Sequence, residues 1–114
     1  MTIGNFVLDV KGRLEKGKRG FRVRRNPNPT RHYFVLDVWL TKEYNTLTKK
    51  EIKKSERRKK VLSEVLQESL VKNSISADAI LNIQVVAGEG RTLNGFFVNV
   101  KIDHFECSYQ YRSA

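Results

Sequence analysis

The stretch TKKEIKKSERRKKVLSEVLQESLVK, residues 48–72, contains no glycine or proline. Before it, apolar residues recur at every second position, and within it they recur at the spacing of a helix. The apolar residues of its second half recur at helical spacing: Leu62, Val65, Leu66 and Leu70. Thr48 and Glu51 match a capping box, in which each side chain satisfies an orphan backbone amide of the other residue. The stretch predicts one helix of about 24 residues, about 36 Å long at 1.5 Å per residue.

Alternation of apolar and polar residues predicts strands on both sides of this helix. The strand segments are residues 5–10, 21–25, 31–41, 78–87 and 96–111. A glycine-punctuated basic stretch at 11–20 and an Asn-Pro stretch at 26–30 are typical of loops. The order is therefore β-β-β-α-β-β. We expect one α+β domain over residues 1–114, in which an antiparallel sheet of about five strands packs on one long helix.

One face of each strand is expected to pack against the helix. This inward set is Phe6, Leu8, Phe21, Phe34, Leu36, Val38, Leu62, Leu66, Leu70, Leu81, Ile83, Val85, Val98, Val100 and Ile102. In the last strand segment the apolar positions change parity at Phe105. A two-residue pleat cannot do this without a bulge or a change of environment.

Size and composition restrict the class of protein. A chain of 114 residues is long enough for one core. The single cysteine, Cys107, excludes an internal disulfide and a multi-cysteine zinc site within one chain, and favours a reducing compartment. No apolar run approaches the roughly 20 residues that span a bilayer, and the first residues do not resemble a signal peptide. We expect a soluble, cytoplasmic protein without a membrane partner.

The charge is unevenly distributed. Residues 1–60 hold eighteen Lys/Arg and six Asp/Glu, whereas residues 61–114 hold four and six. Two runs carry most of the excess: residues 11–31 with nine basic and one acidic, and residues 49–60 with eight basic and two acidic. Such clusters create a local positive potential that attracts polyanions, chiefly nucleic acid or an anionic membrane surface.

The sharpest candidate site is a stripe on the basic half of the helix. Its residues fall at the i, i+3, i+4, i+7, i+8 spacing of one helix face: Lys50, Lys53, Lys54, Arg57 and Arg58. A helix that follows a phosphate backbone needs this geometry, because cations neutralise phosphates one by one. The alternative is a solvated helix end.

A second candidate is a basic hairpin over residues 11–25 that could reach along a nucleic-acid groove. Its candidate contacts are Lys16, Lys18, Arg19, Arg22 and Arg24. An ordinary mobile hairpin is the alternative.

The sheet face turned away from the helix is the third candidate. Strand parity places on it Arg22, Arg24, Tyr33, Trp39, Asn82, Gln84, Asn99 and Lys101. Aromatic, cationic and amide side chains together suit the stacking of single-stranded bases. The same parity also exposes aliphatic residues, which favours an interface between copies: Val7, Val35, Ile80 and Val86. With Trp39, Tyr109 and Tyr111 these predict a homodimer or a higher ring.

No catalytic signature is present. Gly17–Gly20 lacks the spacing and Ser/Thr of a P-loop, and the carboxylates are isolated in the sequence. His104 and Cys107 stand three residues apart, which in a strand places them on opposite faces. His32 and Asp103 are further possible partners that the sequence does not bring together. We therefore expect no enzyme, no cofactor and no metal site.

The segment from Arg57 to Ile102, with helix, turn and hairpin, resembles the heavy-metal-binding domain family of small bacterial and archaeal proteins. The likeness rests on Ala77-Asp78-Ala79, which matches a Gly-Ala-Asp-Ala-like turn except that Ser76 replaces the glycine. The resemblance implies a helix-then-hairpin arrangement and ring-like homo-oligomers, and it carries over no binding residues. The lysine-rich composition also resembles that of small proteins of archaeal viruses and plasmids.

Together these patterns predict a non-enzymatic protein that binds nucleic acid, DNA or RNA, through a basic helix stripe and a basic hairpin. The alternative is a homo-oligomeric module that binds a small ligand or a metal and whose basic segments serve solubility.

Overall fold

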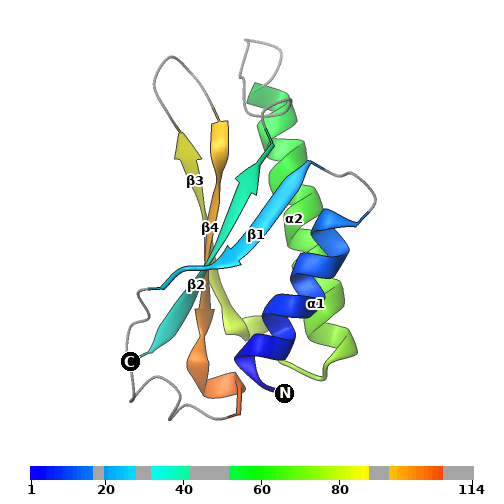
Figure 1. The fold of residues 1–114 in the computed structure, drawn as a ribbon, viewed down its shortest axis with the longest axis vertical. Coiled ribbons are helices and arrows are strands. Elements are labelled where there is room, and N and C mark those ends of the chain that lie inside the picture. The colour runs from blue at the N-terminus through cyan, green and yellow to red at the C-terminus, as the bar shows by residue number, and fades with distance from the viewer. Residues whose placement is uncertain (17–19, 28–31, 42–51, 88–92, 107–114) are drawn as a thin grey trace.

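The computed structural model describes residues 1–16, 20–27, 32–41, 52–87 and 93–106. Its elements are α1 (Ile3–Glu15), β1 (Phe21–Arg25), β2 (Tyr33–Leu40), α2 (Ile52–Lys72), β3 (Ile80–Ala87) and β4 (Leu93–Lys101), with 3-10 turns η2 (Ala77–Ala79) and η4 (Ile102–His104). The strands form one antiparallel sheet in the order β1-β2-β4-β3, and both helices lie against one face of it (Figure 1). The α+β class and the antiparallel sheet are as predicted, but the described residues hold four strands and two helices.

The difference lies at residues 5–10, where the predicted strand is wrong. These residues belong to α1, whose buried side chains Ile3, Phe6, Val10 and Leu14 are three or four residues apart. Thr2 caps the helix by accepting a hydrogen bond from the Asn5 amide at 3.1 Å. Over a window of six residues the sequence alternates like a strand, and only the full thirteen residues show the helical period.

The connections explain the sheet order. Because β2 and β3 both run antiparallel to β4, which lies between them, they are parallel to each other. The segment β2-α2-β3 is therefore a split β-α-β unit. The same strand order would arise from a ferredoxin-like β-α-β-β-α-β unit whose first strand is moved to the end of the chain. In agreement with this relation, the end of the described chain lies beside its start, where Glu106 donates its amide proton to the Met1 carbonyl at 2.9 Å.

The core lies between the inner sheet face and the two helices. Eleven of the fifteen residues predicted to face inward are buried: Phe6, Phe21, Phe34, Leu36, Val38, Leu62, Leu66, Leu70, Val98, Val100 and Ile102. The prediction is wrong for Leu8 and Leu81, which are 67% and 47% exposed. Ile83 and Val85 face inward by register, but Ile83 is only partly buried and Val85 is 46% exposed. Leu8 lies on the outer side of α1, opposite the face that Phe6 and Val10 bury.

The errors on β3 have two causes. Its register against β4 shifts between Ile80 and Asn82, which makes Leu81 the extra residue of a bulge. Ile80, predicted to face outward, consequently packs against the core. Val85 does lie opposite the buried Phe96 and so faces the helix side, but β3 is an edge strand with a neighbour on one side only. Val85 therefore stays half-exposed.

The long helix is as predicted in its described part. α2 runs without a break from Ile52 to Lys72, whereas the capping residues Thr48 and Glu51 lie outside the described residues. Its end is a Schellman motif: the Ile75 amide bonds the Leu70 carbonyl at 2.9 Å, and Ser74 adopts a left-handed φ of 58°.

The parity change near Phe105 also has a structural cause. β4 ends at Lys101, and the turn η4 replaces the predicted continuation of the strand. This turn returns Phe105 to the core, where its ring lies 5.2 Å from Phe6 and 5.5 Å from Phe34. The remainder of the predicted strand, residues 107–111, lies outside the described residues.

Candidate nucleic-acid interface

The strand register determines which side chains share the outer sheet face, the one turned away from the helices. In one row across the sheet Arg22 pairs with Trp39, which pairs with Gly95. In the next row Arg24 pairs with Asp37, which pairs with Phe97. All eight residues predicted for this face have the parity that the register requires: Arg22, Arg24, Tyr33, Trp39, Asn82, Gln84, Asn99 and Lys101.

Two of the predicted aliphatic members of this face lie elsewhere. Val7 belongs to α1 and, like Ile80, packs against the core. Val35 and Val86 do share the outer face, as their partners Asn99 and Gly95 show. The outer face is therefore less aliphatic than the sequence suggested.

An aromatic pair lies on the two central strands of the face. The rings of Trp39 and Phe97 lie edge to face, with centroids 5.8 Å apart and an interplanar angle of 81°. Both side chains are partly exposed, whereas the other five phenylalanines of the chain are buried. Sequence reasoning missed Phe97, although its position beside the inward Phe96 assigns it to the outer face.

Gly95 allows the two central strands to approach each other beneath this pair. A Cβ at this position would collide with the Val38 carbonyl oxygen and lie 2.9 Å from the Trp39 Cα. Neither backbone atom can yield, so glycine is required opposite Trp39.

An ion pair with a buried carboxylate lies beside the aromatic pair. Asp37 is only 1% exposed, yet it accepts hydrogen bonds from Arg24 Nε at 3.1 Å and from Asn26 Nδ2 at 3.2 Å. The Arg24 side chain itself remains 65% exposed. The carboxylate thus fixes one edge of the Arg24 guanidinium while the side chain stays at the surface.

The predicted helix stripe lies on the N-terminal half of α2. Lys53 and Lys54 belong to the helix, although their side chains, like all of Lys50, lie outside the described part. Arg57 is exposed and Arg58 is partly buried. Continued at the same spacing, the stripe becomes the apolar stripe of the helix, which begins with Val61 and Leu62 and packs on the sheet.

The predicted basic hairpin is wrong in its first half. Residues 11–15 are the last turns of α1, so a helix and not a strand precedes β1. Lys16 caps the end of this helix and is exposed, whereas Lys18 and Arg19 lie outside the described residues. Arg22 and Arg24 are exposed on β1. The Glu15 carboxylate accepts the Val23 amide proton at 3.2 Å and so occupies part of the free edge of β1.

A polar cluster joins the two helices. Asp9 Oδ2 accepts hydrogen bonds from Ser69 Oγ at 2.5 Å, Arg13 Nε at 3.0 Å and Asn73 Nδ2 at 3.3 Å. Burial raises the pKa of Asp9, but the hydrogen bonds from Ser69, Arg13 and Asn73 and the Arg13 charge together outweigh it and lower the pKa below its ordinary value. The cluster is an interhelical contact of the fold.

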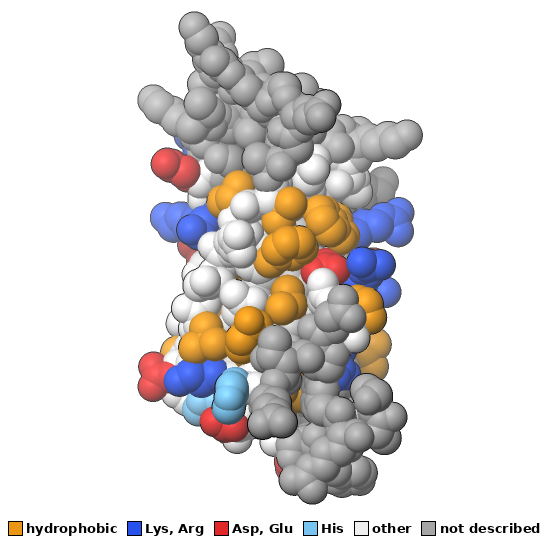
Figure 2. Space-filling model, turned by 90° about the vertical axis from the view of Figure 1, so that its left-hand side faces the viewer, with side chains coloured by type: hydrophobic (Ala, Val, Ile, Leu, Met, Phe, Trp, Pro, Cys, Tyr) orange, Lys and Arg blue, Asp and Glu red, His pale blue; other side chains and the backbone are white. Residues whose placement is uncertain are grey.

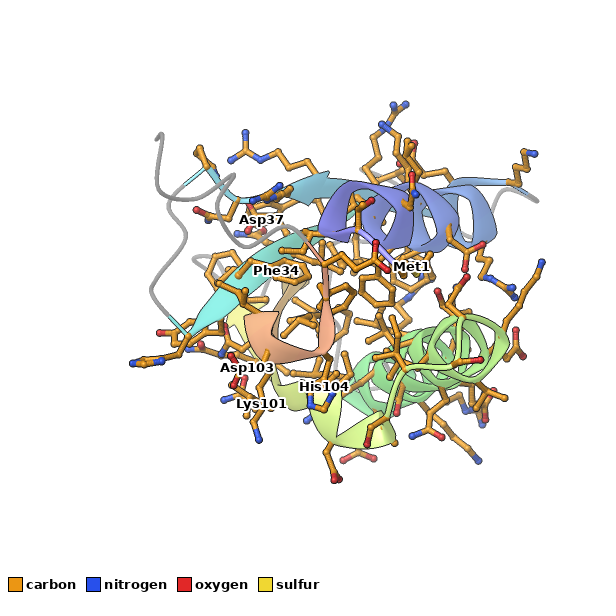
Figure 3. The ribbon with its side chains drawn as sticks, turned by 90° about the horizontal axis from the view of Figure 1, so that it is seen from below. Met1, Phe34, Asp37, Lys101, Asp103 and His104 are labelled. Atoms are coloured by element: carbon orange, nitrogen blue, oxygen red, sulfur yellow. The ribbon has the colours of Figure 1, made fainter. Side chains whose placement is uncertain are left out.

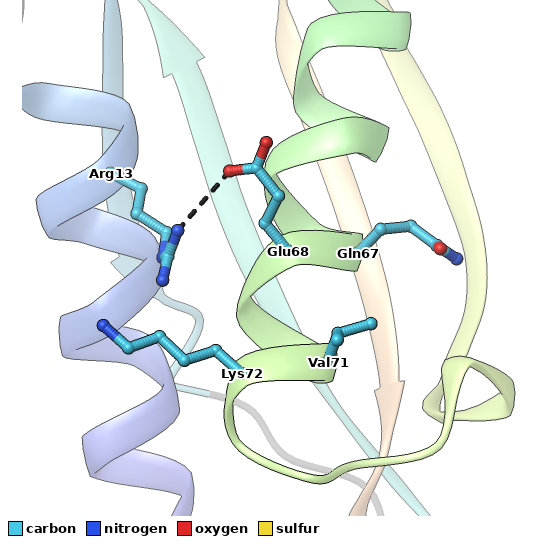
Figure 4. Close-up of a pocket in the computed structure, with 5 residues that line it drawn as sticks. All are labelled: Arg13, Gln67, Glu68, Val71 and Lys72. Atoms are coloured by element: carbon cyan, nitrogen blue, oxygen red, sulfur yellow. Dashed lines mark hydrogen bonds and ion pairs between the residues drawn. The ribbon is translucent and has the colours of Figure 1, made fainter.

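A shallow depression adjoins this cluster between α1 and α2. Its lining is Arg13, Gln67, Glu68, Val71 and Lys72 (Figure 4). Arg13 already pairs with Asp9 at 3.0 Å and with Glu68 at 3.4 Å, which leaves this depression no unpaired arginine for an anionic ligand.

The residues considered for metal binding do not form a described cluster. Among the described residues, no three His, Cys, Asp or Glu side chains gather closely enough to hold a metal ion. Asp103 and His104 lie exposed in η4, just after Lys101 at the end of β4 (Figure 3). Cys107 lies outside the described residues.

Comparison with protein-family models, with curated proteins and with solved structures finds no match for this chain. The resemblance of residues 57–102 to the heavy-metal-binding domain family therefore stays an expectation. Within the described residues, no helix combines the length and the apolar character needed to cross a membrane.

Proposed function

We propose that this protein binds nucleic acid without catalysing a reaction on it, and that the basic half of α2 contacts phosphates. The proposed contacts on the helix are Lys50, Lys53, Lys54, Arg57 and Arg58. Those near β1 are Lys16, Lys18, Arg19, Arg22 and Arg24.

The observation that supports this proposal is that one face of α2 changes from basic to buried apolar residues along the helix. From Leu62 onward this face is buried in the core, and Leu62, Leu66 and Leu70 are at most 1% exposed. From Ile52 to Lys60 the same helix carries six Lys/Arg and one Glu. These nine residues add about 13 Å of helix at 1.5 Å per residue. A helix that served only the core would not need this extension.

Like charges repel one another along part of this extension. Like charges at i and i+4 destabilise a helix, and Lys53–Arg57 and Lys54–Arg58 are two such pairs. A surface evolved for solubility alone usually mixes both signs. A polyanion would relieve the repulsion, because its phosphates would neutralise the lysines and arginines, which in turn displace the counterions condensed on the nucleic acid.

The two basic regions lie at one end of the molecule. Figure 1 places the first turns of α2 beside the end of β2 and the start of β4. Arg22 pairs with Trp39 in the row next to this end of the sheet. Because Arg22 and Arg24 face the side of the sheet turned away from the helices, a nucleic-acid chain that contacts both regions would pass around this end of the sheet. The proposal applies to DNA and RNA alike, and it places the protein in the cytoplasm, the compartment that a lone cysteine favours.

The salt dependence of binding tests this proposal. The five contacts proposed on the helix should alone contribute about −4 to −5 to the slope of log K against log salt on duplex DNA, since each contact contributes about −0.9. The variant Lys53→Gln/Lys54→Gln/Arg57→Gln/Arg58→Gln should reduce that slope by about three to four units. Its unfolding temperature should change little, because surface charges contribute little to stability and Arg58 is only partly buried.

The control variant Lys11→Gln/Lys72→Gln removes charge from α1 and from the other end of α2. Both side chains are exposed, and the slope should stay within about one unit of the parent value. If the quadruple variant binds like the parent, the stripe is only a solvated face. If the parent does not bind at about 50 mM salt, the nucleic-acid function itself is wrong.

A further inference from the structure

The outer sheet face keeps large aromatic side chains at the surface without an evident structural need. Trp39, Phe97 and Tyr33 are partly exposed there, on the two central strands. The inner face of the same strands buries Phe34 and Phe96 completely. The aromatic rings that pack the core are thus on the inner face, and the rings of the outer face are not part of that core.

The surroundings of these rings are cationic. Figure 2, which looks onto this face, shows hydrophobic side chains across its middle and Lys and Arg side chains along both of its margins. By register, Arg22 lies next to Trp39 and Arg24 is one row further along the same edge. Among the described strand residues of this face the one carboxylate is Asp37, which is buried and paired with Arg24.

We propose that this outer sheet face binds single-stranded nucleic acid by stacking bases on Trp39 and Phe97 while Arg22 and Arg24 contact the adjacent phosphates. The inference rests on the proposed nucleic-acid binding and names its substrate class. Bases inside a duplex are stacked on one another and cannot reach a flat sheet, whereas a single strand can splay them onto aromatic side chains. Such stacking tolerates any base, because every base has a π face.

The geometry of the face suits this role. Gly95 lets the central strands close beneath the indole, and the edge-to-face contact with Phe97 at 5.8 Å restricts its orientation. Asp37 similarly holds the Arg24 Nε at 3.1 Å, which orients the guanidinium before a phosphate arrives. Further along, Asn99 donates to Asn82 at 2.8 Å, so amide groups that can recognise base edges continue the surface.

A second copy of the chain fits this face less well. A two-fold interface would bury the same surface of both copies, so Arg22 would be desolvated against a face whose described strand residues offer one carboxylate, Asp37, which already pairs with Arg24. Burying a charge without an opposite charge is costly, whereas the phosphates of a single strand provide opposite charge at the same positions. Charge complementarity therefore favours the nucleic acid.

The test compares variants that keep an apolar side chain at each position but lose the aromatic plane. Trp39→Leu and Phe97→Leu remove one stacking surface each, and Trp39→Phe and Phe97→Tyr restore an aromatic ring. The probes are an oligothymidylate of about 12 nucleotides and a duplex of the same length, at about 200 mM salt, where phosphate contacts are weakened. Circular dichroism checks that every variant is folded, and sedimentation gives the oligomeric state.

The parent should bind oligothymidylate more tightly than the duplex. Each Leu variant should bind oligothymidylate about 5- to 150-fold more weakly, the equivalent of about 1–3 kcal/mol, with little change for the duplex. The aromatic variants should bind nearly as the parent does.

If the Leu variants bind the single strand like the parent, the stacking surface is wrong while the helix contacts stand. If the parent binds the single strand no more tightly than the duplex, the stacking proposal is wrong, and if it binds neither probe even at about 50 mM salt, both proposals fail. If the parent is a dimer that the Leu substitutions dissociate without affecting binding, the face is an interface between copies.

Discussion

The leucines at positions 8 and 14 provide the sharpest test of the fold. Replacing Leu14 by alanine should lower the free energy of unfolding strongly, whereas replacing Leu8 should hardly change it. Both lie in α1, six residues apart, but Leu14 is completely buried whereas Leu8 is 67% exposed. Replacing a buried leucine by alanine removes its transfer free energy and leaves a cavity, which together cost about 2–5 kcal/mol. An exposed leucine contributes little, and alanine is the better helix former.

We therefore expect Leu14→Ala to lower the free energy of unfolding by about 2–5 kcal/mol and Leu8→Ala to change it by less than about 0.5 kcal/mol. In a domain of this size the first change corresponds to a decrease of at least about 8 °C in the melting temperature. Urea titration followed by circular dichroism measures both values. A destabilisation by Leu8→Ala as large as or larger than that by Leu14→Ala, as an inward Leu8 on a strand over residues 5–10 would give, would refute the helix and the packing derived from it.

Two further predictions concern the polar cluster and the strand contact at Gly95. Because the pKa of Asp9 is lowered in the folded protein, its contribution to stability is present above the unfolded pKa of about 3.9 and is lost as the pH falls through the folded pKa. Asp9→Asn should therefore be less stable than the parent at neutral pH, and urea titrations should show this difference shrinking at acid pH. A pH-independent difference would contradict the hydrogen bonds from Ser69 and Arg13. Gly95→Ala should cost about 1–3 kcal/mol or more and alter the near-ultraviolet circular dichroism of Trp39, and an unchanged spectrum would count against the close contact.

The sequence predicts most of the sheet and the long helix because these segments are long and strongly periodic. In β2, for example, four inward residues alternate with Tyr33, Val35, Asp37 and Trp39 without interruption. The register then follows from the need to bury one face of each strand, which is why the composition of the outer face was predictable before its geometry was known.

The failures are local. At α1 the alternation of Phe6, Leu8 and Val10 imitates a strand, and the decisive helical positions Ile3 and Leu14 lie outside that short window. At β3 the bulge at Leu81 turns Ile80 to the core side of the sheet, and no residue type in the sequence predicts this bulge. In the candidate site, the sequence analysis did not include Phe97, which directly follows the inward Phe96. Strand parity alone would have placed Phe97 on the outer face beside Trp39.

The most direct test of the central claim uses the fluorescence of Trp39, which is the only tryptophan of the chain. Titration with single-stranded oligothymidylate should quench this emission to saturation, because a stacked base contacts the indole directly. Polyphosphate, which carries the charges without the bases, should occupy the cationic positions and leave the emission unchanged. Binding is followed in parallel by the anisotropy of a labelled oligonucleotide. Saturated binding without any change in the Trp39 emission would contradict the claim that the outer sheet face receives the bases.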